Sequence, residues 1–202
     1  LLDAAWMTLG LALASLVGGM ALALGFSAAE LSKRSWLVWP VATLTTLIRG
    51  LPELLVVLFI YFGSTQVLFL ITGEYVEFSP FACGVLALSL LFASYATQTL
   101  RAALNAVPAG QRLAALALGL GKSHIFFRIV LPQAWRHALP GLGNQWLVLL
   151  KDTALVSLIG VNEMMRQAQM ASASTYEPFT WYAAAALIYL AISLVSEFGL
   201  KQ

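Results

Sequence analysis

The sequence predicts an all-α membrane protein with five transmembrane helices and one short helix on its cytoplasmic side. Of its 202 residues, 60% are hydrophobic and only 10% are charged, whereas ordinary globular proteins carry about 25% charged residues. The apolar residues lie in charge-poor stretches long enough to cross ~30 Å of hydrocarbon. The basic residues gather in alternate segments between those stretches. We therefore treat residues 1–202 as a single transmembrane domain.

The composition also excludes several other classes of protein. A formal net charge of +2 is too small to suggest binding to nucleic acid. Cys83 is the one cysteine, so it cannot form an internal disulfide, and it matches no metal-ligand spacing. The high hydrophobic content excludes a disordered chain. We expect no metal site in this chain. We expect membrane lipid to surround it.

The N-terminal part of the chain predicts two spans. Residues 4–29 contain no charge and form the first, followed by a polar break that begins at Glu30. Residues 36–72 are nearly all apolar, but as one straight helix they would reach on the order of 55 Å at 1.5 Å per residue. Gly50 and Pro52 are the places for a bend or an unwound turn. We predict a kinked second span over about 37–62.

Three further spans are predicted over 80–104, 138–160 and 178–200. A long basic loop, 105–137, separates the third from the fourth. Lysine and arginine are enriched in loops on the cytoplasmic side of a membrane. Here the basic segments are the first loop, the long basic loop and the C-terminal tail. Arg166 is the one basic residue in the loops on the opposite side. This bias places the N-terminus outside the cell and the C-terminus inside.

The long basic loop carries a recognisable motif. Residues 110–119 read G-Q-R-L-A-A-L-A-L-G, and after nine more residues I-V-L-P follows at 129–132. This pattern resembles the E-A-A-x-x-x-G-x9-I-x-L-P signature of bacterial ABC-importer permeases. The positions that match the signature are Ala114, Ala115, Gly119, Ile129, Leu131 and Pro132.

The resemblance implies a short helix over about 108–122 that lies along the cytoplasmic membrane surface and docks in a groove of an ATP-binding subunit. Its ATPase-coupling residues would be Ala114, Ala115, Gly119, Ile129 and Pro132. The residue types suit a helix, since Pro108 fits its start and Gly119 its end. Spacing alone also allows an amphipathic surface helix without a partner. The signature's leading glutamate is Leu113 here, which leaves the coupling chemistry at that position open.

The resemblance extends over residues 6–200. The runs R-G-L-P-E at 49–53, D-T-A-L-V-S at 152–157 and R-H-A-L-P-G at 136–141 are similar to polar-amino-acid permeases. Residues 141–153 and 177–182 are similar to the Q-type permease subunits of Gram-negative arginine transporters. The resemblance implies a type I ABC importer permease fold in the bacterial inner membrane. It also implies three kinds of partner: a second permease chain, identical or different, two ATP-binding subunits that carry Mg-ATP, and a periplasmic amino-acid-binding protein.

Charged residues inside spans face the bundle interior or water, because exposure to lipid costs a few kcal/mol. Glu53 directly follows the Gly50/Pro52 break, where freed backbone groups can also line a cavity. A carboxylate there can hold a guanidinium in bidentate geometry, and in relatives that carry cationic amino acids the matching acidic residue is implicated in substrate binding. The alternative is a Glu53–Arg49 pair that holds the kink together, since residues i and i+4 share a helix face.

A polar strip runs along the fourth predicted span. Gln145 and Asp152 are seven residues apart and point the same way, beside Asn144 and Lys151, and Ser157 extends the strip further. We predict substrate contacts at Glu53, Asn144, Gln145, Asp152 and Ser157. The strip could instead join two permease subunits, a role for which asparagine and glutamine are typical in membranes. Lys151 and Asp152 are sequence neighbours and are not expected to pair.

The leading hypothesis is a permease subunit of an ATP-driven importer for a cationic amino acid, L-arginine first, with histidine, lysine or glutamine as alternatives. The chain itself is not expected to be an enzyme or to hold a cofactor, because it has no glycine-rich phosphate loop. A haem-binding membrane anchor would need histidines inside spans, and His124 and His137 both lie in the basic loop. An intramembrane hydrolase would need a catalytic pair at membrane depth, which we do not find.

Overall fold

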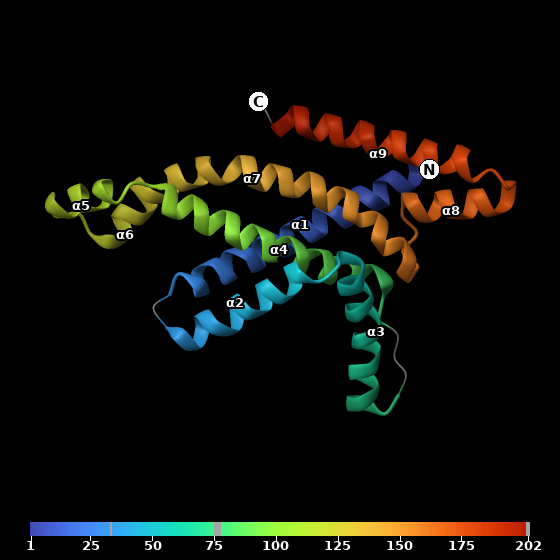
Figure 1. Ribbon diagram of the computed structural model, residues 1–202, viewed down its shortest axis with the longest axis horizontal. Coiled ribbons are helices and arrows are strands. Elements are labelled where there is room, and N and C mark those ends of the chain that lie inside the picture. Colours follow the sequence, from blue (N-terminus) through green and yellow to red (C-terminus); the bar gives the residue numbers. More distant parts are fainter. Residues whose placement is uncertain (33, 75–77, 201–202) are drawn as a thin grey trace.

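The computed structural model describes residues 1–32, 34–74 and 78–200, and in these ranges every regular element is a helix (Figure 1). The predicted all-α fold is confirmed. Three charged residues of the predicted loops lie outside the described residues: Lys33, Glu77 and Lys201.

Four of the described helices are long and apolar enough to cross a membrane: α1 (Leu2–Glu30), α3 (Glu53–Thr72), α4 (Pro80–Ala106) and α9 (Pro178–Leu200). The predicted first, third and fifth spans match α1, α4 and α9 closely. The predicted fourth span corresponds to α7 (Leu131–Asp152), which has 22 residues but is more polar. The predicted number of five spans is therefore approximate.

The second predicted span is two helices. α2 (Ser35–Gly50) ends at the predicted break, where Leu51 is extended because the following Pro52 disfavours helical backbone at that position. α3 then begins at Glu53 and turns away from α2, so that it projects from the rest of the molecule in Figure 1. The predicted end near residue 62 is wrong, since no proline or charged residue interrupts the helix before Thr72.

Small residues let the two most closely packed helices, α1 and α4, approach each other. A Cβ atom on Gly19 of α1 would lie 2.9 Å from the backbone oxygen of Ser89 on α4, so glycine is required there. The Ser89 hydroxyl donates a hydrogen bond to the Ser15 carbonyl oxygen across the same interface, at 3.1 Å. Such small-residue contacts are the usual way for helices to pack inside a bilayer. α4 consequently forms the centre of the bundle, with most of its residues buried.

Glu30 is not the beginning of a polar loop, as the sequence suggested. It is the last residue of α1, and its buried carboxylate forms an ion pair with Arg101 of α4. It also accepts a hydrogen bond from the hydroxyl of Thr45 on α2, at 3.2 Å. The carboxylate thus joins three helices, a role visible only once they are brought together.

The basic segment between α4 and α7 is helical rather than a loop. It contains α5 (Ala109–Ala117), α6 (Lys122–Ile125) and a π-helical turn, η1 (Phe126–Val130). α5 starts after Pro108, as predicted, but ends at Ala117, before the predicted 122. Gly119 terminates it with a left-handed backbone, φ +75°, which glycine adopts without strain.

Beyond Asp152 the chain tightens into a 3-10 helix, η2 (Thr153–Ile159), and then turns through Gly160 into α8 (Met164–Thr175). The predicted span over 138–160 is therefore wrong at its C-terminal end. α8 and α9 lie side by side, and the N-terminus of α1 lies next to them (Figure 1). This corner is at the opposite end of the molecule from α5 and α6.

Candidate functional site

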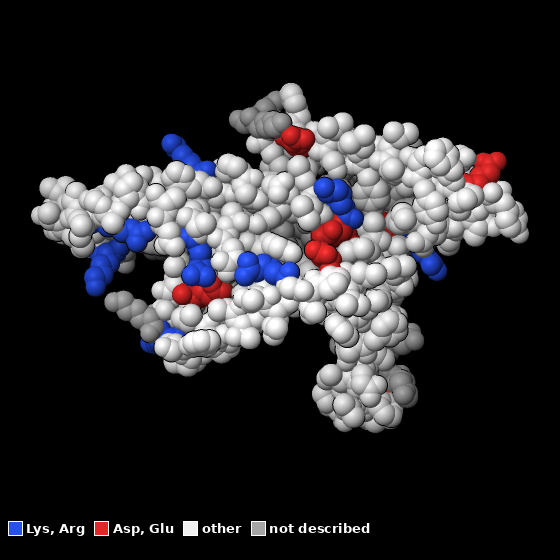
Figure 2. All heavy atoms as spheres, in the orientation of Figure 1, with Lys and Arg blue, Asp and Glu red and all other residues white. Residues whose placement is uncertain are grey.

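Four of the five predicted substrate residues line one hollow of about 280 Å³: Glu53, Asn144, Gln145 and Asp152. The hollow lies where the start of α3 meets α4 and the second half of α7. Its apolar wall comprises Leu91, Phe92, Tyr95, Val148 and Leu149. Figure 2 shows a small group of acidic and basic side chains close to the point where α3 joins the bundle, on a surface that is otherwise mostly uncharged. The structure thus brings two carboxylates, two amides and two aromatic rings to one place.

Helix geometry explains the arrangement. Residues 144, 145, 148, 149 and 152 recur at spacings of three, four and seven, so they share one face of α7. Glu53 is the first residue of α3, where a carboxylate also meets the positive end of the helix dipole. The break at Gly50–Pro52 therefore does two things: it turns the chain and it places an acidic side chain at the hollow.

Gln145 has one satisfied and one unsatisfied polar atom. Its Nε2 donates a hydrogen bond to the Thr99 hydroxyl of α4 at 2.7 Å. Its Oε1 is buried and has no hydrogen-bond partner among the described residues. Because an unpaired buried acceptor is costly, a rotation of the amide that exposes this oxygen to the hollow would let it accept an N–H group from a bound molecule.

The proposed Glu53–Arg49 pair is not formed. Arg49 belongs to α2, and its Nε donates to the backbone oxygen of Thr45 at 3.2 Å. The i, i+4 rule fails here because Leu51 and Pro52 separate the two residues into different helices. Glu53 is half-buried and faces the hollow instead.

Ser157 does not join the other four predicted residues. It lies in η2, buried, and its hydroxyl donates to the Ala154 carbonyl oxygen at 2.7 Å. The prediction assumed that the α-helical period continues past Asp152, whereas a 3-10 helix has three residues per turn. The change of period rotates Ser157 away from the hollow.

Two aromatic residues of the hollow were not predicted as substrate contacts. Phe92 and Tyr95 lie on α4 and form part of its wall. Their spacing is compatible with one helix face, but the same pattern is typical of ordinary core packing, so the sequence carried no distinguishing signal. Lys151, next to Asp152, lines a different hollow together with Tyr182 and Tyr189. As expected, it forms no ion pair with Asp152 within 4 Å, although the two charges interact at longer range.

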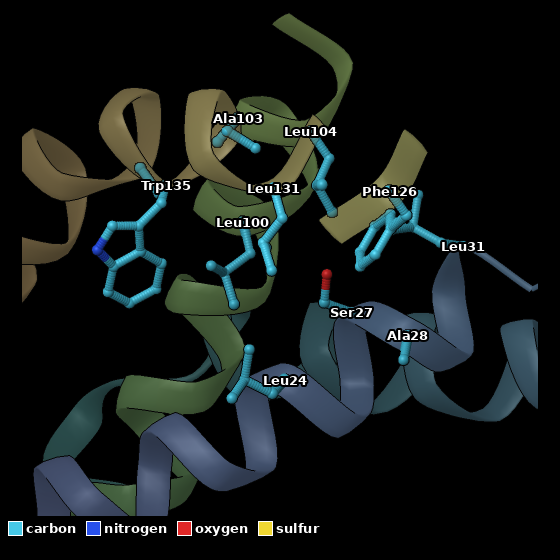
Figure 3. A pocket seen from close by; sticks show the side chains of 12 residues that line it. Leu24, Ser27, Ala28, Leu31, Leu100, Ala103, Leu104, Phe126, Leu131 and Trp135 are labelled. Carbon is cyan, nitrogen blue, oxygen red and sulfur yellow. The ribbon is translucent and has the colours of Figure 1, made fainter. Parts of the chain in front are cut away.

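A second hollow, of about 300 Å³, has a different chemical character (Figure 3). It lies between α1, α4, η1 and α7, and its wall consists of leucine and alanine side chains with Phe126 and Trp135. The hydroxyl of Ser27 is one of few polar atoms in the wall. It offers no charged group to recognise a polar amino acid, so the hollow at Glu53 is the candidate substrate site.

The predicted coupling residues divide into an exposed and a buried set. Ala114, Gly119 and Pro132 are exposed. Ala115 is buried in a small apolar cluster with Val107, Ile125, Val130 and Ala134, and Ile129 packs against that cluster. Ala115 and Ile129 therefore hold α5 to the rest of the chain rather than presenting a surface to a partner.

α5 also carries features that the motif does not contain. Leu113, Leu116 and Leu118 are 65%, 48% and 79% exposed, so the helix and its C-terminal turn present an apolar surface. Gln133 of α7 donates to Gln111 Oε1 of α5 at 2.6 Å, and Arg112 donates to the Leu104 carbonyl oxygen of α4 at 2.9 Å. These two bonds connect α5 to the C-terminal end of α4 and to the first turn of α7.

Comparison with known proteins identifies the family. The family described as binding-protein-dependent transport system inner membrane component matches residues 21–201. The chain belongs to this family. It is an ABC transporter permease subunit, and in such transporters separate ATPase subunits hydrolyse ATP. Membership also implies ATPase and substrate-binding partners and a place in a membrane.

Two relatives and one solved structure extend this family match. The arginine ABC transporter permease protein ArtQ of Haemophilus influenzae is 57% identical over 199 residues, which cover 98% of this chain and 89% of that protein. ArtQ of Escherichia coli K12 is 55% identical over 219 residues, covering 100% of this chain and 92% of that protein. A crystal structure of an amino acid ABC transporter with histidines has a TM-score of 0.89 at 30% identity, covering 99% of this chain and 90% of that one.

Proposed function

We propose that this permease subunit forms the translocation path of an ATP-driven importer for a cationic amino acid, with L-arginine as the first candidate. The observation that carries the proposal is the pair of carboxylates, Glu53 and Asp152, in one hollow. Neither carboxylate has a cation within 4 Å among the described residues, and Lys151, which interacts with Asp152 at longer range, supplies one positive charge against two negative ones. The remaining negative charge favours a positively charged guest. The identity to two arginine transporter permeases supports the choice of L-arginine.

The hollow offers complementary contacts for each part of such a molecule. A guanidinium can form paired hydrogen bonds with a carboxylate and can stack on an aromatic ring such as Tyr95. Gln145 Oε1 accepts a further N–H, and the Asn144 amide donates to the α-carboxylate. A volume of about 280 Å³ is just below the range of about 300–1,000 Å³ for small-molecule sites, as suits a single amino acid.

In this proposal the importer contains a second permease chain, identical or different, two ATP-binding subunits and a periplasmic amino-acid-binding protein. The segment from α5 to the start of α7 docks on an ATP-binding subunit through Ala114, Gly119 and Pro132 together with the exposed leucines of α5 and its C-terminal turn, since an apolar exposed surface marks an interaction site. The binding protein docks on the face that contains α8. The N-terminus lies in the periplasm and the C-terminus in the cytoplasm of a cell with this subunit in its inner membrane.

The test is uptake by the reconstituted transporter from a panel of amino acids. Proteoliposomes are loaded with ATP, and the binding protein is added outside. They should accumulate L-arginine in preference to glutamine, with lysine and histidine in between. ATP-dependent uptake of glutamine with none of L-arginine would contradict the proposal. Uptake of histidine or lysine in preference to L-arginine would support a cationic amino acid as the substrate but show that it is not L-arginine.

A further inference from the structure

The chain contains a buried carboxylate that lies outside the candidate site. Glu163 lies in the turn between η2 and α8, and its exposed fraction is 0%. It caps α8, accepting hydrogen bonds from the backbone N–H groups of Met165 at 2.8 Å and Arg166 at 2.7 Å. Burial raises the pKa of Glu163, and these backbone hydrogen bonds act in the opposite direction. An α-helix can be capped by an exposed residue, so the burial asks for a further explanation.

Glu163 is the first member of a chain of contacts that ends at the candidate site. The hydroxyl of Tyr189, on α9, donates to Glu163 Oε2 at 2.9 Å. The same hydroxyl lies 3.3 Å from Oγ1 of Thr153. Thr153 is the first residue of η2 and directly follows Asp152, which lines the candidate site. The Tyr189 hydroxyl thus connects α9 with the N-terminal cap of α8 and with the first residue of η2, and it also interacts with the Thr8 hydroxyl of α1.

The hydrogens in this chain are too few for its contacts. Tyr189, Thr153 and Thr8 supply one hydroxyl hydrogen each, and that of Thr8 also has the Ala4 carbonyl oxygen as an acceptor at 3.2 Å. An ionised Glu163 takes the one from Tyr189, so the hydrogen of Thr153 must go either to Tyr189 or to the Leu150 carbonyl oxygen, 2.7 Å away in the last turn of α7. Two alternative partners for one hydrogen give the end of α7 two arrangements that differ by a single hydrogen bond.

We propose that Tyr189 is a positioning residue that couples the N-terminus of α8 to Asp152 through Thr153. This inference rests on the proposed function, in which α8 belongs to the face that the binding protein contacts. A displacement of α8 moves Glu163, changes its bond to Tyr189 and shifts the Thr153 hydrogen between its two acceptors. The backbone at Asp152 then changes, and with it the geometry of the carboxylate pair. Docking of the binding protein on α8 thereby changes the geometry of the substrate site.

The experiment measures ATP hydrolysis by the reconstituted transporter, with and without its substrate-loaded binding protein. Tyr189→Phe removes the hydroxyl and keeps the ring. It should reduce stimulation by the binding protein at least about tenfold, the size expected for a hydrogen bond to a charged group, and leave basal hydrolysis and assembly unchanged. Tyr182→Phe is the matched control, because Tyr182 lies on the same helix, lines the same hollow and has no side-chain hydrogen bond in the described structure.

A double-mutant cycle separates coupling from packing. Thr153→Val should reduce stimulation as Tyr189→Phe does, and the double variant should be no worse than either single variant, because all three interrupt the same chain. Four outcomes would overturn the inference. Stimulation could be normal in Tyr189→Phe, or reduced equally in Tyr189→Phe and Tyr182→Phe. The losses could instead be additive in the double variant, or the variants could fail to assemble. If the wild-type transporter does not respond to its binding protein at all, the proposed function fails instead.

Discussion

Glu53 and Asp152 face the same hollow, although one begins α3 and the other ends α7. Neither helix alone makes a binding site, and the two residues meet because α3 and α7 both pack against α4. Like charges in one place repel, so a cation that binds between them gains from both.

The amide of Gln145 should contribute to substrate binding beyond its role in packing. Gln145→Leu removes both the bond to Thr99 and the unpaired Oε1, whereas Thr99→Val removes the bond alone. We expect Gln145→Leu to raise the KM for uptake about tenfold, in line with the loss of one hydrogen bond to a charged group, and Thr99→Val to change it much less. Equal effects of the two variants would limit Gln145 to a structural role.

The exposed leucines of α5 should be more important for ATPase binding than the missing motif glutamate. Leu116→Glu places a charge in the apolar surface and should release the ATP-binding subunit during purification. Leu113→Glu restores the residue that the family motif has at that position, so assembly and ATP-coupled uptake should remain normal. Co-purification of the two subunits measures both. Retention of the ATPase by Leu116→Glu would show that this surface is not the docking site.

The Glu30–Arg101 ion pair should stabilise the bundle. Arg101→Met leaves the buried Glu30 carboxylate without its partner. Breaking a fully buried pair costs about 3–5 kcal/mol, and partial exposure of Arg101 reduces the expected cost to about 2 kcal/mol. Thermal unfolding in detergent should show a lower midpoint. The double variant Glu30→Gln with Arg101→Met should recover much of the loss, and no recovery would indicate that Arg101 acts through packing.

The contact between α1 and α4 should tolerate no added side chain at Gly19. Gly19→Ala brings a Cβ to 2.9 Å from the Ser89 carbonyl oxygen, so the helices must separate, at a cost of about 1–3 kcal/mol for overpacking. Gly25→Ala, six residues along the same helix, meets nothing within 4 Å and serves as the control. Fluorescence-detected size-exclusion chromatography after heating should distinguish the two. Equal stability would contradict the close α1–α4 packing.

Much of the fold follows from local sequence. α9 begins at Pro178 and runs through a stretch with no charge until Glu197, so length and hydropathy suffice to predict it. The break before Glu53 follows from Gly50 and Pro52. The predicted face of α7 was correct up to Asp152, because its period is that of an α-helix.

Other features depend on contacts between distant segments. The 3-10 helix from Thr153 to Ile159 contains no glycine or proline to signal it, and it removed Ser157 from the predicted site. The burial of Glu30 depends on Thr45 and Arg101, which come from two other helices. A sequence read one segment at a time cannot place such partners.

Uptake of radiolabelled L-arginine by proteoliposomes with Glu53→Gln permease tests whether the Glu53 carboxylate binds the cation of the substrate. Glu74→Gln, an exposed carboxylate beyond the end of α3, is the matched control, and co-purification with the ATP-binding subunit verifies assembly. Loss of one charge-assisted contact should reduce ATP-dependent uptake at least about tenfold in Glu53→Gln and leave Glu74→Gln normal. Wild-type uptake by an assembled Glu53→Gln transporter would contradict the assignment of Glu53 to the substrate site.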